Sequence, residues 1–260
     1  MANERSTALI TGASSGIGRD LARVFAADGY NLVLVARRAA ALQGLADELT
    51  REYRIAASVI AVDLAKPDAT AQIVAQVSAA GTVVDVVVNN AGFGLQGTVA
   101  ELPLERQLEM IQVNVTALTA LSRALLPGML SRNRGGILNV GSTAAFQPGP
   151  LMAVYYATKA YVESFTEALA EEVSGTAVRV SCLCPGPTET GFAEAAAIAD
   201  TNLFRRTVMT SADVARIGYE GWKRGKVLVV PGFSNRMGMA VVRFSPRPMV
   251  RRVVKRLNGR

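Results

Sequence analysis

The sequence predicts an α/β protein in which a doubly wound parallel sheet lies between two layers of helices. Short runs of Val, Ile and Leu are nearly continuous in hydrophobicity, as expected for strands that are covered on both faces. They alternate with helical segments, which favours right-handed βαβ units. The 260 residues show no internal repeat and no boundary before about residue 232. We therefore expect one domain of three layers, α/β/α.

Strand and helix alternate through the first half of the chain. In chain order, we expect strand 7–13, helix 16–29, strand 31–37, helix 39–53, strand 56–65, helix 68–81 and strand 83–92. Each expected strand is a run of small or branched apolar residues, which suits a buried strand. Gly29 ends the first helix, because glycine readily adopts the conformation that follows a helix.

The second half continues the alternation with longer helices. We expect helix 104–131, strand 135–142, helix 153–174, strand 177–186, helix 211–225 and strand 226–232. The strand at 177–186 contains Cys182 and Cys184, which point to the same face. Two cysteines without any histidine are too few ligands for a structural zinc site. We expect reduced cysteines, no metal site and a cytoplasmic protein.

Neither end of the sequence nor its interior predicts a membrane anchor. Residues 1–12 lack a basic stretch followed by an apolar run, so no signal peptide is expected. No run of about 18 apolar residues is free of charges and helix breakers, so no transmembrane helix is expected. The net charge of +7 is uneven: residues 221–260 hold eleven Lys and Arg and no acid, which leaves 17 basic against 21 acidic residues elsewhere.

A glycine-rich loop follows the first strand. In TGASSGIG, Gly12 permits a tight turn, Gly16 lets the backbone approach a pyrophosphate, and Gly18 lets the helix pack closely on the sheet. The N-terminus of the helix offers free N–H groups to phosphates. A plain tight turn is the alternative. The position of the loop in the first strand-to-helix turn favours dinucleotide binding.

The end of the second strand indicates which dinucleotide is bound. A sheet that binds NAD usually has an acid there, whereas a 2′-phosphate needs a cation. Here Ala36 is followed by Arg37 and Arg38, which favours NADP(H), with Arg37 as the main contact and one arginine simply solvated. Asp63, at the end of the third strand, accepts a hydrogen bond from the adenine amino group or caps the next helix.

Three motifs occur in order along the chain: the glycine loop, NNAG at 89–92 and Tyr-x-x-x-Lys at 155–159. Because of these motifs, the chain resembles the short-chain dehydrogenase/reductase family in its compact single-domain branch. The resemblance covers about residues 5–231 and implies a Rossmann-type domain at 1–231, followed by a basic C-terminal extension at 232–260. The glycine spacing differs from that of the extended branch, which disfavours sugar-nucleotide epimerases.

The resemblance implies a catalytic set of Asn114, Ser142, Tyr155 and Lys159. Tyr156 lies one residue out of register and points about 100° away on a helix. Lys159 lies on the same helix face as Tyr155 and is expected to lower its pKa and to hold the nicotinamide ribose. Tyr155 then acts as acid and base, Ser142 polarises the carbonyl, and Asn114 holds a water, unless it only bends its helix.

The resemblance also implies a cofactor site that runs along the carboxyl edge of the sheet. Its expected residues are Gly12, Ser14, Ser15, Gly16, Ile17, Gly18, Arg37, Asp63, Leu64, Asn89, Ala91, Gly92, Tyr155, Lys159, Pro185, Gly186, Thr188 and Thr190. Pro185, Gly186 and Thr190 are expected at the nicotinamide carboxamide.

Apolar residues dominate the segments expected to surround the substrate. They are Phe93, Leu95, Phe146, Met152, Phe192, Ile198, Leu203, Phe204 and Met209. We therefore expect a hydrophobic small molecule as substrate. Together with this expectation, the family resemblance implies an NADP(H)-dependent enzyme that interconverts a ketone or aldehyde and an alcohol, assembled as a dimer or tetramer. A dinucleotide sensor without catalytic activity is the alternative, but it would have no need of the catalytic residues.

The basic extension has its own pattern. Residues 246–260 place Met249, Val250, Val253, Val254 and Leu257 on one helix face and four basic residues on the other. This apolar face either docks on the protein or lies on an anionic membrane surface, which would make the protein peripheral to a membrane. Nucleic-acid binding is not expected, because the tail has two phenylalanines but no recognition module.

Overall fold

The computed structural model describes residues 5–192, 196 and 208–259. Seven parallel strands form one sheet in the order β3-β2-β1-β4-β5-β6-β9. Their bounds are β1 Thr7–Thr11, β2 Asn31–Ala36, β3 Ala57–Ala61, β4 Val86–Asn89, β5 Gly136–Val140, β6 Arg179–Leu183 and β9 Leu228–Val229. The order reverses between β1 and β4, as in a doubly wound sheet. The predicted fold class is confirmed.

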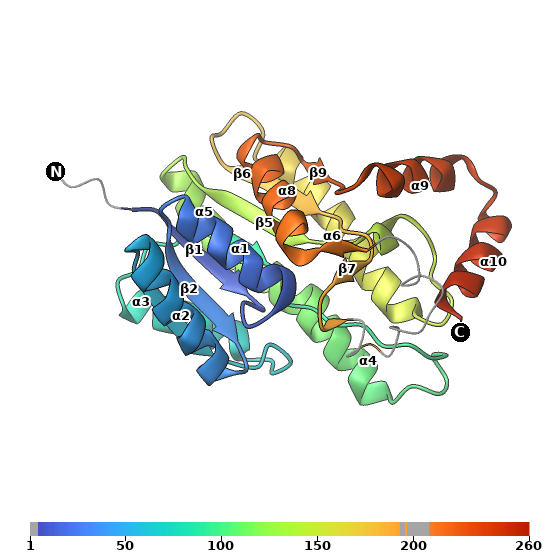
Figure 1. Ribbon diagram of the computed structural model, residues 1–260, viewed down its shortest axis with the longest axis horizontal. Helices are drawn as coiled ribbons and strands as arrows, with labels where there is room; N and C mark the ends of the chain where they lie inside the picture. Colours follow the sequence, from blue (N-terminus) through green and yellow to red (C-terminus); the bar gives the residue numbers. More distant parts are fainter. Residues whose placement is uncertain (1–4, 193–195, 197–207, 260) are drawn as a thin grey trace.

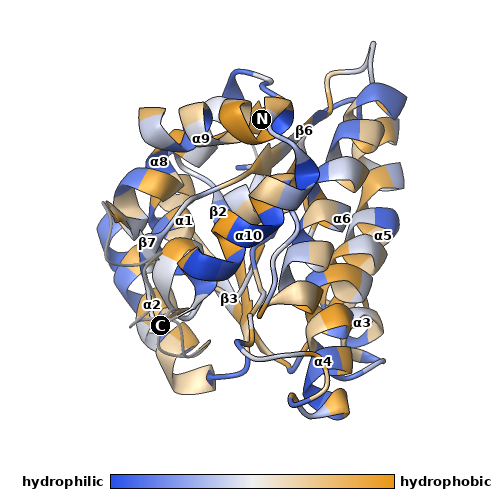
Figure 2. Cartoon of the chain, turned by 90° about the vertical axis from the view of Figure 1, so that its right-hand side faces the viewer, coloured by the Kyte–Doolittle hydropathy of each residue, from blue (hydrophilic) through white to orange (hydrophobic). Residues whose placement is uncertain are grey.

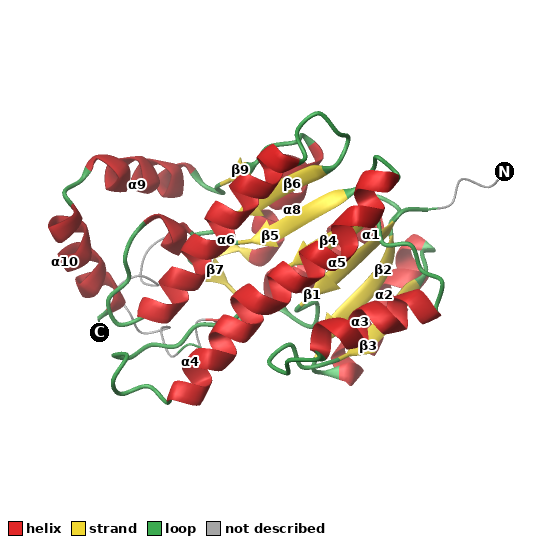
Figure 3. Ribbon diagram, turned by 180° about the vertical axis from the view of Figure 1, so that it is seen from behind, coloured by secondary structure: helices red, strands yellow, loops and turns green. Residues whose placement is uncertain are grey.

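Helices cover both faces of the sheet (Figure 1, Figure 3). One face carries α1 Gly16–Ala27, α2 Ala39–Tyr53 and α8 Ser211–Lys223, and the other carries α3 Ala69–Ala79, α5 Leu118–Ser131 and α6 Ala153–Glu172. Alternate residues of β1 divide between these layers. Ala8 and Ile10 pack with the first set of helices, and Leu9 packs with the second, because successive side chains of a strand point to opposite faces.

The helical run Leu104–Ser131 consists of α4 Leu104–Ile111, the π-helix η1 Gln112–Ala117 and α5. By length and composition it would suffice to cross a membrane, although we expected no such helix. It contacts β4, β5 and α6, and Leu118, Leu121 and Met129 are buried against the sheet and its neighbouring helices. Core helices pass the same test, so the run is weak evidence for a membrane span.

Two short elements complete the described domain. After β6, strands β7 Thr188–Glu189 and β8 Met209–Thr210 form a separate parallel pair.

Cys182 and Cys184 are free and buried, and their Sγ atoms lie 3.5 Å apart. They therefore share one face of the strand, as predicted.

The C-terminal extension contains two helices rather than the one expected. α9 Phe233–Phe244 was not predicted, and α10 Arg247–Asn258 begins between Pro246 and Pro248. The predicted apolar face of α10 is divided: Val250 and Val254 are buried, whereas Met249 and Val253 are exposed. This correction follows from the packing, because only the part of the face that meets the domain is covered. Figure 1 shows both helices at one end of the molecule.

Candidate active site

A cavity of about 660 Å³ lies along the carboxyl edge of the sheet. Loops that follow six neighbouring strands reach it, with Asp63 after β3, Arg37 after β2, Gly12 after β1, Asn90 after β4, Ser142 after β5 and Pro185 after β6. In open α/β sheets, ligands bind at this edge where the strand order reverses. The topology therefore brings together residues that are far apart in the sequence.

The glycine loop has a backbone that side chains would disturb. Gly12 and Gly16 have φ values of +66° and +54°, in the left-handed region that favours glycine. A Cβ atom on Gly18 would lie 2.3 Å from Asn90 Nδ2 and 2.4 Å from the Gly12 carbonyl oxygen. Gly12 and Gly16 line the cavity, whereas Gly18 packs behind it and lets α1 approach the sheet.

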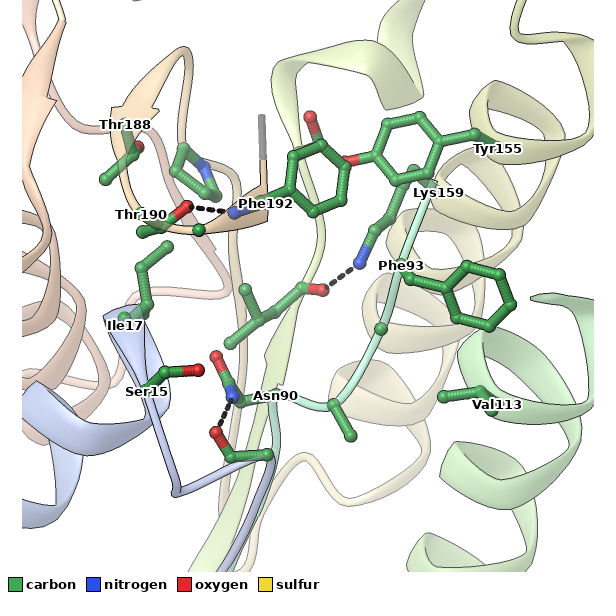
Figure 4. A pocket seen from close by; sticks show the side chains of 18 of the residues that line it. Ser15, Ile17, Asn90, Phe93, Val113, Tyr155, Lys159, Thr188, Thr190 and Phe192 are labelled. Carbon is green, nitrogen blue, oxygen red and sulfur yellow. Dashed lines mark hydrogen bonds between the residues drawn. The ribbon is translucent and has the colours of Figure 1, made fainter. Parts of the chain in front are cut away.

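Asn90, at the end of β4, is hydrogen-bonded to the residue that precedes this loop (Figure 4). Its Nδ2 donates to the Thr11 carbonyl oxygen at 2.8 Å, and its backbone N–H donates to Thr11 Oγ1 at 3.0 Å. Asn89, which we expected to line the cofactor, instead turns away and donates to Ser122 Oγ and Asn139 Oδ1. The structure thus assigns the cavity position to Asn90, because adjacent residues at the strand end face opposite ways.

The end of the cavity beside the glycine loop is built from N–H groups and cations. Ser14, Ser15, Gly16 and Ile17 line it, and α1 has no side-chain cap on its first N–H groups. The first N–H groups of a helix have no acceptor within the helix. These donors, together with the glycine backbone, fit the pyrophosphate of a dinucleotide.

Two arginines lie at this end of the cavity, where it opens to solvent. Arg37 and Arg38 both line the cavity and are exposed. Arg38 Nη2 donates to the Ser14 carbonyl oxygen at 3.2 Å and to Ser14 Oγ at 3.1 Å. Arg38 is therefore held against the glycine loop, whereas Arg37 makes no side-chain hydrogen bond to the part of the chain that the structure describes.

The end of the cavity that we expected to hold adenine contains Asp63 and Leu64. Both residues line the cavity. Asp63 Oδ1 accepts a hydrogen bond from the Ala65 N–H at 3.1 Å, so it stabilises its own turn. The N-cap of α3 is Asp68, and Asp63 therefore does not cap that helix.

Tyr155, Lys159 and Ser142 meet where the cavity passes between β5 and α6. The phenol of Tyr155 is hydrogen-bonded to the side chain of Ser142. Lys159 Nζ donates to the Val140 carbonyl oxygen at 2.7 Å and lies 5.9 Å from the centre of the Tyr155 ring (Figure 4). All three line the cavity. Tyr156, the neighbouring tyrosine, sends its hydroxyl to Asn258 instead.

Asn114 lies behind this group, in the π-helix. Its Nδ2 donates to the Phe93 carbonyl oxygen and to Thr158 Oγ1, and its Oδ1 accepts from the Phe93 N–H at 3.1 Å. A Cβ atom on Gly92 would lie 3.0 Å from Asn114 Oδ1 and 3.5 Å from Lys159 Nζ. The Asn114 side chain thus fixes the segment that separates it from Lys159. Among the described residues, none of its side-chain hydrogen bonds is to Lys159.

Burial controls the proton affinities at this site. It raises the pKa of Tyr155 well above the ordinary value for a phenol, and the hydrogen bond to Ser142 only partly opposes this effect. It lowers the pKa of Lys159 to about 8. The expectation that Lys159 lowers the pKa of Tyr155 stays a prediction: desolvation of the phenolate raises this pKa, and the hydrogen bond to Ser142 lowers it.

The depressed pKa of Lys159 makes folding stability depend on pH. The unfolded chain keeps this proton up to its ordinary pKa of 10.5, whereas the folded protein releases it above about 8. Between these pH values the unfolded state binds more protons than the folded state. The free energy of unfolding of the wild type therefore rises with pH, because the cost of burying Lys159 falls as the lysine loses its proton. We expect Lys159→Met to exceed the wild type in free energy of unfolding by a margin that narrows from pH 8 to 10. Denaturant titrations measure it.

The matched control for this titration is Lys226→Met, which changes an exposed lysine. Its difference from the wild type should stay flat over the same pH range. A constant or widening margin for Lys159→Met would show that Lys159 keeps its proton in the folded protein.

The segment after β6 forms the wall next to Tyr155. Pro185, Gly186, Thr188 and Thr190 line the cavity, and Thr190 Oγ1 accepts a hydrogen bond from the Phe192 N–H at 3.2 Å. A Cβ atom on Gly186 would lie 2.4 Å from Asn235 Oδ1, so α9 contacts this wall directly.

Only some of the apolar residues that we expected around the substrate line the cavity. Phe93, Met152 and Phe192 line it, and the Phe192 ring lies 5.4 Å from that of Tyr155. Leu95 packs beside them, Phe146 packs on another cluster, and Met209 packs against the main core. Arg106 and Glu109 also line the cavity, so it carries charges that we did not expect. Ile198, Leu203 and Phe204 lie outside the described residues.

A buried amide near the end of α10 ties these walls together. Asn258 Oδ1 accepts from Tyr156 Oη at 3.1 Å, and Asn258 Nδ2 donates to the Pro150 carbonyl oxygen at 3.0 Å. The backbone carbonyl oxygen of Asn258 accepts a hydrogen bond from Gln96 Nε2 at 2.6 Å. We call Asn258 and these three partners the Asn258 hub. Nothing in the sequence around Asn258 indicated this role.

Known proteins share the sequence pattern and the fold. The family model described as short chain dehydrogenase matches residues 6–200. An uncharacterized oxidoreductase of Myxococcus xanthus is 34% identical over 251 residues, which cover 96% of this chain and 97% of the relative. An NADP-dependent 3-hydroxy acid dehydrogenase of Salmonella typhi is 40% identical over 179 residues, which cover 68% and 71%.

A solved structure supports the same relationship. The short-chain dehydrogenase from Sphingobium yanoikuyae in complex with NADPH superimposes with a TM-score of 0.82 at 32% identity, covering 90% of this chain and 92% of that one. Other relatives are longer. The chain spans 60% of a short chain dehydrogenase of Pseudocercospora fijiensis and about half of several very-long-chain 3-oxoacyl-CoA reductases, such as that of Laccaria bicolor, at 52%.

Proposed function

This chain belongs to the short-chain dehydrogenase family, and from that premise we propose that it is an NADP(H)-dependent oxidoreductase that interconverts a carbonyl compound and an alcohol. The observation that carries the proposal is the meeting of Tyr155, Ser142 and Lys159 in one cavity with a glycine loop. Acid–base residues and a dinucleotide cradle in the same cavity suit hydride transfer better than sensing alone. The arginines at the mouth and the NADPH-bound relative support NADP(H).

The residues divide the chemistry between them. NADPH, when bound, would supply the hydride for the carbonyl carbon. Tyr155 donates its phenolic proton to the carbonyl oxygen, and the raised pKa keeps that proton on the phenol until the oxygen becomes basic. Ser142 hydrogen-bonds the same oxygen and stabilises its developing charge. In the reverse direction, Tyr155 takes the proton from the alcohol.

Lys159 and Asn114 support this step from behind. Lys159, buried and hydrogen-bonded to Val140, places a positive charge beside the phenolate that forms when Tyr155 gives up its proton. It is also the group that we assign to the nicotinamide ribose. Asn114 positions the Gly92–Phe93 segment, and its proposed role in holding a proton-relaying water rests on the family resemblance.

We further propose that the substrate is a hydrophobic molecule. Phe93, Met152 and Phe192 surround the end of the cavity that contains Tyr155. The matching relatives named 3-oxoacyl-CoA reductases are consistent with a carbonyl on a long apolar chain. Arg106 at the same cavity is paired with Glu109, so this pair adds no net charge to the apolar lining.

A substrate screen tests the proposed function. The purified protein is mixed with NADPH and a panel of aliphatic, aromatic and 3-oxo carbonyl compounds, and the loss of NADPH absorbance is followed. We expect turnover of apolar members, with NADPH preferred over NADH. If no carbonyl compound is turned over although NADPH binds, a non-catalytic dinucleotide sensor replaces the proposal.

The long helices predict self-association. Leu104, Leu108 and Ile111 form an exposed apolar stripe on α4, and Tyr161 is exposed on α6. Exposed apolar stripes of this kind mark protein interfaces. We expect a dimer or tetramer by light scattering at micromolar concentration, and we expect Leu108→Glu to reduce the measured mass. A monomeric wild type would contradict this prediction.

A further inference from the structure

The helix α9 carries an apolar stripe that the domain does not cover. Phe233, Met237, Val241 and Phe244 are each between 49% and 86% exposed. At about 100° per residue, their spacing places them within about 80° of one another around the helix. None of the twelve residues of α9 is fully buried. Four large apolar side chains therefore form one continuous exposed line.

The opposite face of α9 is the one that meets the protein. Asn235, Met239 and Val242 are half-buried and lie on the other side of the helix. Asn235 lies against Gly186, and Val242 packs on the apolar cluster that contains Tyr155 and Tyr156. The exposed stripe thus points away from the domain. Figure 2 looks onto this end, where α9 carries apolar positions and α10 carries strongly hydrophilic ones.

The surroundings of the stripe are cationic. Arg236 and Arg243 lie on one flank of α9. On α10, the exposed residues Arg251, Arg252 and Lys255 add to this charge, and residues 221–260 contain no Asp or Glu at all. Met249 and Val253 extend the exposed apolar surface onto α10. An apolar line flanked by cations is the pattern of helices that lie in a membrane interface.

We propose that α9 and α10 form a docking surface for a membrane that contains anionic phospholipid, with the α9 stripe inserted among the acyl chains and the arginines at the phosphates. Anionic headgroups complement a surface that has cations and no acids. A second copy of this chain fits less well, because pairing two such surfaces would bring like charges together. The proposal is independent of the proposed enzymatic function.

The contacts of α10 give the docking surface a connection to the cavity walls. Val250 and Val254 pack in the same cluster as Met152 and Tyr155, and Asn258 bonds the neighbouring loops. Membrane contact would therefore place the substrate end of the cavity close to the lipid surface. This arrangement suits a substrate that partitions into membranes.

Vesicle co-sedimentation of the full chain tests the proposal. Vesicles of phosphatidylcholine with phosphatidylserine are compared with vesicles of phosphatidylcholine alone, at low and high salt. We expect binding to the anionic vesicles that weakens as salt rises. The double variant Phe233→Ser with Phe244→Ser should lower the partition coefficient by about tenfold or more, since it removes the apolar insertion.

Two further double variants make the result specific. Arg243→Gln with Arg251→Gln should reduce binding and flatten its salt dependence. Val83→Ser with Val227→Ser changes exposed valines at the amino ends of β4 and β9, and it should bind like the wild type. Circular dichroism confirms that each variant is folded, because all these side chains are exposed.

Two outcomes would overturn the proposal. Binding that the phenylalanine variant leaves unchanged, or no binding of the wild type at low salt, shows that the stripe does not enter lipid. If the wild type ignores vesicles and the same phenylalanine variant lowers the mass measured by light scattering, a second copy of the chain covers the stripe instead.

Discussion

Tyr155→Phe is expected to lower kcat by about 10²–10⁴-fold, the contribution of a positioned general acid. The ring stays in the apolar cluster with Phe192 and Tyr156, so the fold and the cavity are preserved. Only the hydroxyl that meets Ser142 is lost. Because that group acts in the transition state, the Kd for NADPH should change little. Steady-state kinetics and a fluorescence titration with NADPH measure the two quantities.

Tyr156→Phe is the matched control for this result. Its hydroxyl donates to Asn258 and lies outside the catalytic group, so its loss should cost about 1 kcal/mol in stability and little in kcat. A thermal melt records the first effect. If Tyr156→Phe abolished turnover and Tyr155→Phe did not, our assignment of the catalytic tyrosine would have to move by one residue.

Arg37→Ala should weaken NADPH binding by about tenfold or more and leave NADH binding nearly unchanged. The guanidinium at the cavity mouth can pair with a 2′-phosphate, and a hydrogen bond to a charged group contributes about 1.5–3 kcal/mol. Exposure to solvent places the effect toward the low end of that range. Ala36→Asp with Arg37→Ala should reverse the preference, since the new carboxylate repels the phosphate and can accept from the ribose hydroxyls.

The neighbouring arginine provides the comparison. Arg38 is held by Ser14, so Arg38→Ala should loosen the glycine loop and weaken both cofactors to a similar degree. Titrations of both variants with NADPH and NADH separate these effects. Equal losses of the two cofactors in Arg37→Ala, with a selective loss of NADPH in Arg38→Ala, would assign the 2′-phosphate to Arg38.

Much of the fold was predictable because local pattern and tertiary packing agree. The strands between residues 7 and 183 are apolar runs since helices cover both faces of the sheet, and the glycines of the first turn are those whose backbone tolerates no side chain. The spacing of Tyr155 and Lys159 on α6 likewise follows from helix geometry. Their proton affinities were not predictable, because they depend on burial by residues from other elements.

Other features depend on contacts that leave no local pattern. α9 was missed because its few inward residues, such as Asn235 and Met239, are polar or isolated in the sequence. We predicted Asn89 at the cavity, but the structure places Asn90 there. The two differ by one residue in register at the end of the strand, which the sequence pattern does not fix. The division of the apolar face of α10 became visible only when the position of the domain beneath it was known.

The Asn258 hub means that the walls of the cavity do not vary independently. One amide residue joins the loop of Gln96, the loop of Pro150 and the helix of Tyr156, and these segments lie more than a hundred residues from it along the chain. Residues that share one hydrogen-bond network show non-additive mutational effects. Directed evolution of this enzyme toward new substrates would therefore meet epistasis at these positions: the value of a substitution at Gln96 depends on the residue at 156, and combined libraries would find variants that single-site scanning discards.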